Sequence, residues 1–222
     1  MSRRLVLLRH GRTAWNAQER AQGHLDVELD EVGRRQAAEV APVVAAFQPA
    51  MLWTSDLVRA RQTCRPLELA TGLTARADPR LREYDVGSRQ GMTSAQFETA
   101  FPEAYAAWRA GHERPVVPGA ETASEVAARM VPALHEALAG LEDGETGVVV
   151  THGACLKVAL LGLLGWPQSQ AATLRGVANC GFSTVTERAG VLRLEAYNQQ
   201  VSTLSRALPG GRADFASGPA VG

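Results

Sequence analysis

Two short apolar runs in this chain end in the same way, each in a histidine followed by a glycine. The run Leu5–Leu8 leads into Arg-His-Gly at positions 9–11, and the run Gly147–Val150 leads into Thr-His-Gly at positions 151–153. Short apolar runs bounded by turn-forming residues are typical of buried strands, and the ligands of open α/β sheets bind just beyond the carboxyl ends of such strands. The repeated pattern therefore predicts one site in which His10 and His152 lie together.

The order of the predicted elements indicates the fold class. Strand patterns alternate with helical patterns, which is typical of a largely parallel sheet covered by helices on both faces. We therefore expect an α/β three-layer sandwich, to which a pair of alternating runs near the end of the chain adds an antiparallel edge. Strands are predicted at 4–8, 51–54, 73–77, 147–150, 182–186 and 191–196, and helices at 30–46, 56–71, 94–100, 102–110, 122–140 and 154–164.

Capping residues and prolines mark where the predicted helices begin, end or break. Pro42 falls inside the first helix and should kink or divide it, because proline removes a backbone hydrogen bond and clashes with the preceding turn. Gly72 should end the second helix. The predicted N-terminal caps are Asp30 for the first helix, Ser55 or Asp56 for the second, and the capping-box pairs Thr93 with Gln96 and Thr122 with Glu125.

Three further stretches do not fit this alternation. The segment 11–28 is polar and irregular, and a connection of that length inside a compact domain is often functional. The two short helices within 93–119 are expected to form a small lid beside the strand ends, inserted into a single domain that spans 1–203. The tail 204–222 is rich in Gly, Ala, Pro and Ser and is predicted to be disordered.

Composition and charge argue against several classes of function. A formal net charge of zero is unlike a nucleic-acid binder, which usually presents a basic face. The three cysteines are scattered and odd in number, which fits reduced cytosolic thiols rather than a disulfide framework or a zinc site. No apolar run approaches the ~20 residues of a membrane span, and no h-region of a secretory signal precedes the first strand. We therefore expect a cytoplasmic protein without nucleic-acid or membrane partners.

Cationic side chains near the two histidines predict an anion site. Arg9 offers planar paired donors that suit a phosphate group, and the glycine after His10 permits close backbone approach. Arg59 lies in the first turns of a helix that follows a strand, where backbone N–H groups favour anions, whereas Arg61 points to a different face and is expected to be solvated. A neutral imidazole such as that of His10 can act as a nucleophile.

A carboxylate is also expected near this site. Glu83 and Asp85 both follow the third predicted strand, and either carboxyl group is placed to protonate a leaving oxygen. The pattern alone leaves the two residues open and also fits a solvated acidic loop. The chain has no HxH or HExxH spacing for zinc, too few grouped carboxylates for magnesium and no P-loop, so neither a metal nor another cofactor is expected.

Several ordered sequence blocks resemble the histidine phosphatase superfamily, the phosphoglycerate-mutase-like proteins. The resemblance covers about residues 4–199, and several blocks in one order are far more specific than a lone Arg-His-Gly. The blocks are Leu8–Asn16 (Leu-Arg-His-Gly-Arg-Thr-Ala-Trp-Asn), Gln22-Gly23 with Asp26, Leu29–Gly33, Ser55–Thr63, Leu81–Glu83 with Gly87 and Gly91, Pro118–Thr122 and Thr151–Gly153.

This resemblance implies a role for each matching residue. His10 would be the nucleophile that becomes phosphorylated. Glu83, rather than Asp85, would protonate the leaving oxygen and then act as a base for the attacking water. The phosphoryl group would be held by Arg9, Arg59 and His152, with Asn16, Gln22 and Gly23 from the following loop and backbone donors from Gly153 and Ala154 at the start of a helix.

The same resemblance implies the reaction. The chain lacks the long insertion typical of the cofactor-dependent mutases, and the Ser55–Thr63 segment resembles the phosphatase branch. The loop Gln22–Asp26 and the chain length resemble in particular the enzymes that act on glucosyl-3-phosphoglycerate. We therefore expect a metal-independent phosphomonoesterase that hydrolyses a small phosphorylated metabolite, a phosphoglycerate or sugar-phosphoglycerate, through a phosphohistidine. A homodimer is compatible with this expectation. The alternatives are a phosphoglycerate mutase and a catalytically inactive phosphate-binding module.

The chain departs from the family pattern at Arg89-Gln90-Gly91, where many relatives carry an acidic residue before the glycine. This departure concerns the substrate rim.

Overall fold

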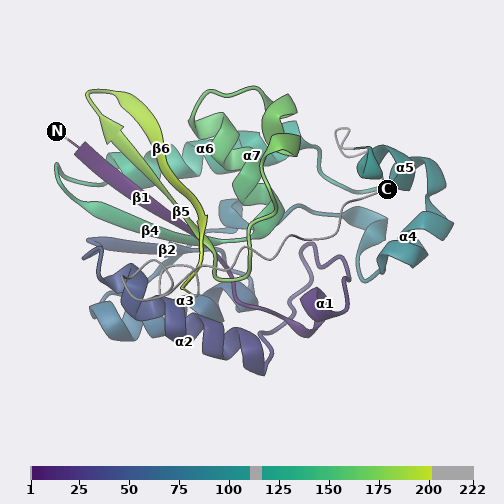
Figure 1. The fold of residues 1–222 in the computed structure, drawn as a ribbon, viewed down its shortest axis with the longest axis horizontal. Coiled ribbons are helices and arrows are strands. Elements are labelled where there is room, and N and C mark those ends of the chain that lie inside the picture. Colours follow the sequence, from purple (N-terminus) through teal and green to yellow (C-terminus); the bar gives the residue numbers. More distant parts are fainter. Residues whose placement is uncertain (1, 111–116, 202–222) are drawn as a thin grey trace, which may run out of the picture.

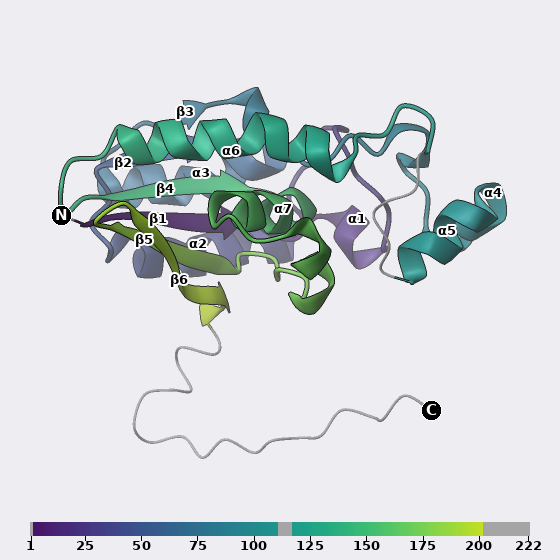
Figure 2. The ribbon, with the colours of Figure 1, turned by 90° about the horizontal axis from the view of Figure 1, so that it is seen from above.

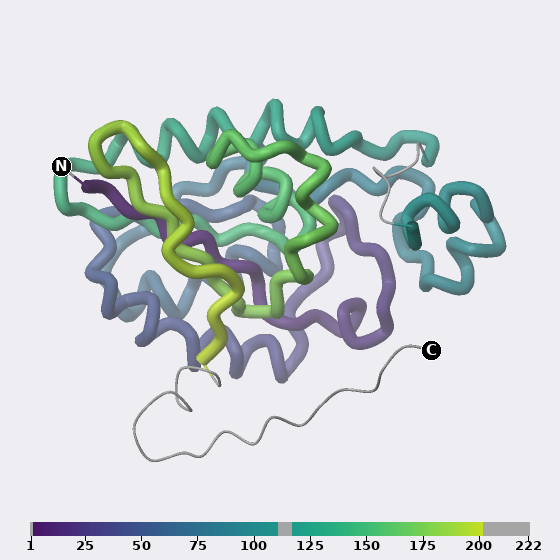
Figure 3. The backbone as a smooth tube through the Cα atoms, turned by 45° about the horizontal axis from the view of Figure 1, so that its top comes forward, coloured from purple at the N-terminus to yellow at the C-terminus, as the bar shows by residue number. Residues whose placement is uncertain are grey.

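In the computed structural model, the chain folds around one six-stranded sheet (Figure 1). The structure describes residues 2–110 and 117–201. The strands are β1 (Ser2–Arg9), β2 (Met51–Thr54), β3 (Arg76–Ala77), β4 (Thr146–Thr151), β5 (Phe182–Arg188) and β6 (Val191–Gln199). Their order is β3-β2-β4-β1-β5-β6, in which β1 pairs parallel with β4 and antiparallel with β5. The backbone trace shows the N-terminal strand in the middle of the sheet, between strands from the second half of the chain (Figure 3).

Helices cover both faces of the sheet. The α-helices are α1 (Ala14–Ala17), α2 (Glu31–Ala45), α3 (Val58–Thr71), α4 (Ser94–Ala100), α5 (Pro102–Arg109), α6 (Ala123–Ala139) and α7 (Gly153–Leu163), and the 3-10 helices are η1 (Pro79–Leu81), η2 (Gly87–Arg89) and η3 (Gln168–Thr173). α2 and α3 lie on one face, and α6 and α7 on the other (Figures 1 and 2). α4 and α5 stand apart from the sheet, at the end toward which β1 and β4 run. The predicted three-layer α/β architecture is therefore confirmed.

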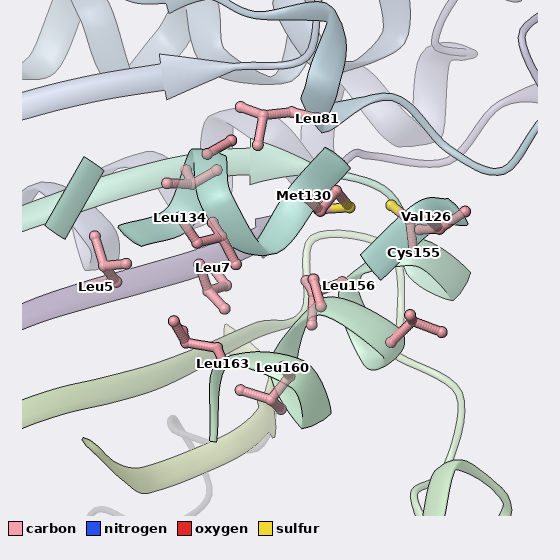
Figure 4. Packing of buried hydrophobic residues seen from close by; sticks show 14 of the residues in the cluster. Leu5, Leu7, Leu81, Val126, Met130, Leu134, Cys155, Leu156, Leu160 and Leu163 are labelled. Atoms are coloured by element: carbon pink, nitrogen blue, oxygen red, sulfur yellow. The ribbon is translucent and has the colours of Figure 1, made fainter. Parts of the chain in front are cut away.

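Alternate residues of the central strands supply two separate cores. Leu5 and Leu7 of β1 pack with residues of α6 and α7, whereas Val6 and Leu8 pack with residues of α2 and α3. Successive side chains of a strand point to opposite faces, so a strand that is apolar at every position is buried on both sides. Figure 4 shows the first core, where Met130 of α6 faces the sheet. The apolar side chains that α6 turns toward the sheet are all buried: Val126, Met130, Ala133, Leu134, Ala137 and Leu138.

Most of the predicted caps are confirmed. Asp30 caps α2, because its side chain accepts a hydrogen bond from the Gly33 N–H group at 2.8 Å. The capping boxes that begin at Thr93 and Thr122 are both present, at the starts of α4 and α6. Gly72 ends α3 in the left-handed conformation, with φ of 72°. The last two strands form the predicted antiparallel hairpin, which continues the sheet to its β6 edge.

Two predicted details are wrong and a third is partly so. Pro42 does not divide α2, which continues past it as one helix to Ala45, and the other expected outcome, a kink, stays a prediction. The third strand is only Arg76–Ala77, and these two residues pair with Trp53 and Thr54 of β2. The segment 11–28 is not irregular throughout. It contains the one-turn helix α1, which begins at a capping box between Thr13 and Asn16.

The N-terminal cap of α3 is also different from the prediction. Neither Ser55 nor Asp56 caps this helix, and the Val58 N–H group instead donates to Oδ1 of Asp26 at 2.6 Å. The Ser55 hydroxyl is bonded to Nε2 of His152, and the Asp56 carboxylate forms an ion pair. Both predicted caps are therefore engaged elsewhere, and a residue of the preceding loop replaces them.

The helices α4 and α5 form a small cluster of their own. Phe97, Ala104 and Val117 are its buried members. Residues 111–116 of the predicted lid, and the predicted disordered tail 204–222, lie outside the described residues. Across 2–110 and 117–201, the structure has no helix long and apolar enough to cross a membrane. The three cysteines, Cys64, Cys155 and Cys180, are buried as free thiols.

Candidate active site

The central pair of strands brings both histidines to the same end of the sheet. β1 and β4 are parallel, and Arg9 lies opposite Thr151 in their register. His10 and His152 follow these two residues, so they leave the sheet side by side. Their ring centroids are 5.1 Å apart with an angle of 60° between the ring planes, and both side chains are buried. One site with two imidazoles is therefore present in the fold.

A cleft of about 520 Å³ opens next to these histidines. Its lining contains all the residues expected at the site except His152, which lies against His10, and Gly153, which lies against Arg9. The cleft therefore joins the end of β1, the loop after it, α3, the loop after β3 and the start of α7. The lining residues are Arg9, His10, Asn16, Arg20, Ala21, Gln22, Gly23, Arg59, Glu83, Val86, Arg89 and Ala154.

The His10 ring has a defined tautomer. Nδ1 lies 2.7 Å from the Gly11 carbonyl oxygen and can only donate to it, so Nδ1 carries the proton and Nε2 carries the lone pair. Burial lowers the pKa of His10 well below its ordinary value, and the charges of Arg9 and Arg59 lower it further. The ring is therefore a neutral imidazole near pH 7, which is the nucleophilic form.

Residues from near the end of the described chain hold the backbone of the nucleophile. Asn179 donates from Nδ2 to the His10 carbonyl oxygen at 3.1 Å and to Oδ1 of Asn16 at 3.3 Å. The Cys180 N–H group donates to the same His10 oxygen, and the Arg9 N–H group donates to the Gly181 carbonyl oxygen. Asn179 lies in no recognisable sequence motif, and its contact with the nucleophile is to a backbone oxygen, so the sequence alone does not reveal it.

Arg59 is fully buried and fixed by three different partners. Its Nη1 and Nη2 donate to the carbonyl oxygens of Leu25 and Gly23, each at 2.7 Å, and its Nε donates to Nδ1 of His152 at 3.1 Å. Burial lowers the pKa of Arg59 to about 10, so the side chain is still charged at neutral pH. Gly23 has φ of 55°, a conformation that glycine adopts without strain. The loop that contains Gly23 and Leu25 is therefore fixed against the Arg59 guanidinium by its carbonyl oxygens.

His152 is hydrogen-bonded to Arg59 and does not itself line the cleft. Because Nδ1 of His152 accepts from Arg59, Nε2 carries the proton and donates to the Ser55 hydroxyl at 2.8 Å. Burial lowers the pKa of His152 well below its ordinary value, and the Arg59 charge adds to this effect. Both ring nitrogens are thus engaged by protein groups, and Ser55, which the sequence predicts as a possible helix cap, is one of these partners.

Arg9 is held in a tight space at the end of β1. Its Nη1 donates to the Val177 carbonyl oxygen at 2.5 Å, while its buried Nε finds no hydrogen-bond partner within the described part of the chain. A Cβ atom on Gly153 would lie 2.9 Å from this Nε, so only glycine leaves room for the guanidinium. Burial also lowers the pKa of Arg9. A buried cationic donor without a protein partner is suited to an anion from outside.

Glu83 is the carboxyl group of the cleft. Its Oε1 accepts from the N–H groups of Tyr84 and Cys155, at 3.0 and 2.8 Å, and its Oε2 accepts from the Ala154 N–H group at 3.1 Å. The side chain therefore lies at the N-terminus of α7, where backbone donors favour an anion. Asp85 lies outside this cleft and accepts from the Gly87 N–H group instead. The Ala154 donor that was expected on the phosphoryl group is directed at Glu83 in this structure.

Arg129 and His24 fix the loop that carries Glu83. Arg129 donates from Nη2 to the Glu83 carbonyl oxygen at 2.8 Å, and from Nη1 to the carbonyl oxygens of Arg80 and Arg82. Its Nε donates to Glu121 at 2.8 Å. His24 donates from Nε2 to the same Glu83 oxygen at 2.8 Å. The signal for Arg129 in the sequence is weak, because it is only an arginine beside core positions of an amphipathic helix.

A second cavity of about 310 Å³ adjoins the cleft. The two share Val86 and Arg89. The second cavity is formed mainly by apolar side chains of α4, α5 and the segment after 117, with two carboxylates at its edge. Its remaining lining residues are Asp85, Phe97, Trp108, Val117, Ala120 and Glu121.

Comparison with known proteins identifies the class that this fold and site define. The family model of the histidine phosphatase superfamily (branch 1) matches residues 5–200, and the chain belongs to this family. The resemblance seen in the sequence blocks is thereby confirmed, and the protein is an enzyme of the phosphatase class.

Individual relatives and solved structures show which members of this family the chain resembles. Glucosyl-3-phosphoglycerate phosphatase of Mycolicibacterium vanbaalenii is 39% identical over 186 residues, which cover 81% of this chain and 82% of the relative. A probable phosphoglycerate mutase, GpmB of Yersinia enterocolitica, is 37% identical over 185 residues, which cover 82% of this chain and 83% of the relative. A structure of mycobacterial glucosyl-3-phosphoglycerate phosphatase with VO3 superposes with a TM-score of 0.83 at 38% identity, and covers 89% of this chain and 100% of that one.

Proposed function

We propose that this phosphatase hydrolyses monoesters of small metabolites, of the phosphoglycerate or sugar-phosphoglycerate class, through a phosphohistidine at Nε2 of His10 and without a metal. The observation that carries the proposal is the neutral His10 ring, with its proton on Nδ1, beside the buried guanidinium groups of Arg9 and Arg59. The substrate class is supported by the glucosyl-3-phosphoglycerate phosphatases that this chain resembles.

The first step transfers the phosphoryl group to the protein. The Nε2 lone pair of His10 attacks phosphorus, and the bond between phosphorus and the ester oxygen breaks. The Glu83 carboxyl group gives its proton to the leaving oxygen, so that an alcohol departs. Oε2 of Glu83 accepts only one of the three backbone hydrogen bonds, and we assign the proton to this oxygen.

The second step returns the protein to its starting state. The Glu83 carboxylate takes a proton from water while the water oxygen attacks phosphorus, and the bond between phosphorus and Nε2 of His10 breaks. Inorganic phosphate leaves, and Glu83 again carries the proton needed for the next cycle. The overall reaction is therefore ester plus water to alcohol plus phosphate.

Two guanidinium groups provide most of the electrostatic stabilisation in this proposal. A phosphate monoester carries about −1.5 to −2 charges near pH 7. Arg9 and Arg59 offset this charge at the cleft, and Arg59 is already fixed by Leu25, Gly23 and His152. Donors that are held in place before the reaction need no reorganisation when charge shifts in the transition state.

Trapping the phosphorylated enzyme tests the proposal. The protein is mixed with a substrate labelled in its phosphoryl group, quenched in alkali and digested, and the labelled peptide is sequenced by mass spectrometry. We expect an acid-labile label on His10. His10→Ala should lose the label and reduce turnover by more than about 10⁴-fold, whereas His135→Ala, a change at an exposed histidine of α6, should keep both. Ordinary turnover by His10→Ala would reject the mechanism.

One relative supports a second candidate function, a phosphoglycerate mutase. A mutase passes the phosphoryl group from the histidine back to an organic acceptor, whereas a phosphatase passes it to water. The two are separated by incubating the protein with 3-phosphoglycerate and measuring released phosphate and 2-phosphoglycerate in the same sample. We expect phosphate to be the main product, and isomer formation in excess of phosphate release would favour the mutase.

A further inference from the structure

Ser55 is a buried serine at the end of β2 that takes no part in the two proposed chemical steps. Its N–H group donates to the Val150 carbonyl oxygen of β4 at 2.9 Å, because β2 and β4 are parallel neighbours in which Thr54 lies opposite Val150. His152 is the first residue after β4. The parallel pairing therefore places the Ser55 side chain beside the His152 ring.

The side chains of Arg59, His152 and Ser55 form a hydrogen-bonded row with one direction. Nε of Arg59 can only donate, so Nδ1 of His152 accepts from it, at 3.1 Å. A neutral imidazole carries one proton, which therefore lies on Nε2, and the Ser55 hydroxyl oxygen accepts it at 2.8 Å. The opposite tautomer of His152 would direct its Nδ1–H group at the Nε–H group of Arg59, and the contact between the two side chains would be lost.

Ser55 stabilises the tautomer that Arg59 requires. The Nε2–H group of His152 is buried, and its acceptor in the described structure is the Ser55 hydroxyl oxygen. The same oxygen accepts from the Leu57 N–H group at 3.4 Å, so two donors orient it as an acceptor. A buried donor that loses its acceptor is unfavourable. Loss of the hydroxyl would therefore favour a rotated His152 ring that no longer accepts from Arg59.

Arg59 uses this contact to hold its remaining donors in place. A guanidinium has five N–H bonds, and the described residues take three of them, at His152, Leu25 and Gly23. One N–H bond on each Nη is left for a ligand, and Arg59 lines the cleft. A guanidinium that is held at all three nitrogens cannot turn in its own plane. The direction of the two remaining N–H bonds therefore depends on His152 as well as on the loop.

We propose that Ser55 is a positioning residue for phosphoryl transfer. By accepting the Nε2 proton of His152, it keeps the ring in the tautomer that accepts from Arg59, and so fixes the guanidinium that faces the phosphoryl group. This inference deepens the proposed function and rests on it, because it takes Arg59 as a phosphoryl-binding residue. Ser55 itself does not line the cleft. Since fixed donors matter most when charge shifts in the transition state, the effect should appear in kcat rather than in KM.

Steady-state kinetics of single variants give the first test. Ser55→Ala should reduce kcat on p-nitrophenyl phosphate by about 10- to 100-fold, with KM changed by less than about threefold. Ser55→Thr keeps the hydroxyl oxygen and should recover the larger part of this loss. The matched control is Thr54→Val, which removes the neighbouring buried hydroxyl, a donor to the Ser55 carbonyl oxygen, and should keep kcat within about twofold. An unchanged kcat in Ser55→Ala would overturn the inference.

A double-mutant cycle tests whether Ser55 acts through Arg59. Arg59→Lys removes the Nε donor, so the tautomer of His152 should then matter little. On that background Ser55→Ala should cost less than about twofold in kcat, whereas in Glu83→Gln it should cost nearly as much as in the unmodified protein. An undiminished loss on the Arg59→Lys background would show that Ser55 does not act through this guanidinium, and would reject the inference.

Nitrogen-15 NMR of the histidine-labelled, unmodified protein observes the tautomer itself, so this test does not depend on how the variants fold. The His152 signals are assigned by their absence in His152→Gln. We expect a protonated Nε2 and an unprotonated Nδ1 that accepts a hydrogen bond, and a shifted Nε2 signal in Ser55→Ala. A His152 proton on Nδ1 would overturn the inference. Labelling of His10 by substrate would still uphold the proposed function in that case.

Discussion

Nη2 of Arg129 donates a hydrogen bond of 2.8 Å to the backbone carbonyl oxygen of Glu83. This contact ties the proposed proton donor to α6, a helix that contributes no residue to the cleft lining. The same guanidinium reaches the carbonyl oxygens of Arg80 and Arg82 and the carboxylate of Glu121. The Arg129 side chain thus fixes the backbone of residues 80–83, which carries Glu83.

Replacing Arg129 by lysine should loosen this turn. Lysine keeps the charge but has no planar fork, so it cannot satisfy three carbonyl oxygens and a carboxylate together. We expect kcat on alkyl phosphates to fall by about tenfold or more while KM changes little, and the free energy of unfolding to fall by about 1–3 kcal/mol. Steady-state kinetics and urea unfolding measure the two effects. Arg61→Lys, on the exposed part of α3, is the control, and an unchanged kcat in Arg129→Lys would show that the clamp has no effect on the reaction.

Glu83→Gln should discriminate between leaving groups. An amide cannot protonate a poor leaving oxygen, whereas nitrophenolate departs without such help. We expect a loss of about 10²- to 10⁴-fold on alkyl phosphates and a clearly smaller loss on p-nitrophenyl phosphate. Asp85→Asn, a change at the carboxylate outside the cleft, should show no such dependence on the leaving group. Equal losses on both substrates in Glu83→Gln would remove this residue as the acid.

The two buried histidines should make the protein less stable in mild acid. The pKa values of His10 and His152 are lowered in the folded state, so between pH 6.5 and those lower values the unfolded chain binds more protons than the folded chain. The free energy of unfolding should therefore fall as the pH falls below about 6.5, by up to about 1.4 kcal/mol per pH unit for each histidine. Above about pH 7.5 these residues should contribute no slope.

Urea unfolding between pH 5.5 and 8 in phosphate-free buffers measures this dependence. His152→Gln should remove about half of the slope, because one of the two titrating rings is lost. Phosphate is avoided because a ligand that binds only the folded state would stabilise it. A flat profile from pH 7 to 5.5 would contradict the burial of neutral imidazoles at the site.

Gly153→Ala should harm activity more than stability. The new Cβ atom would lie 2.9 Å from Nε of Arg9, which forces the guanidinium out of its position, although alanine is a better helix residue than glycine. We expect kcat/KM to fall by about tenfold or more, with the unfolding free energy changed by less than about 1 kcal/mol. Gly140→Ala, where the added atom meets only ordinary contacts at 3.6 Å and beyond, is the matched control. Full activity in Gly153→Ala would show that Arg9 tolerates displacement.

The sequence predicted best what depends on local pattern. The runs before His10 and His152 are apolar at every position because both faces of these strands are buried, and that pattern is enough to place the two rings at one end of a parallel sheet. The capping boxes at Thr93 and Thr122 are equally local. The roles given to individual site residues came from the resemblance to a family, and they stay predictions until the variants above are measured.

What the sequence did not show depends on contacts between distant segments. Asp26 replaces the expected caps of α3, because Ser55 is bonded to His152. Asn179 and Arg129 act through backbone carbonyl oxygens, for which no residue pattern exists. Ala154 illustrates the same limit. The sequence predicts that its N–H group donates to the phosphoryl group, and only the folded chain shows that the Glu83 carboxylate accepts from it.

Asn179 and Cys180 both donate hydrogen bonds to the His10 carbonyl oxygen, and these bonds have a consequence for biosynthesis. The nucleophile leaves the ribosome well before its backbone partners, because some 169 positions separate His10 from Asn179. A nascent chain that ends before this point can build neither the β5 neighbour of β1 nor the hydrogen bonds that hold the His10 carbonyl oxygen. Phosphatase activity should therefore arise abruptly, and late, in a series of stalled chains of increasing length.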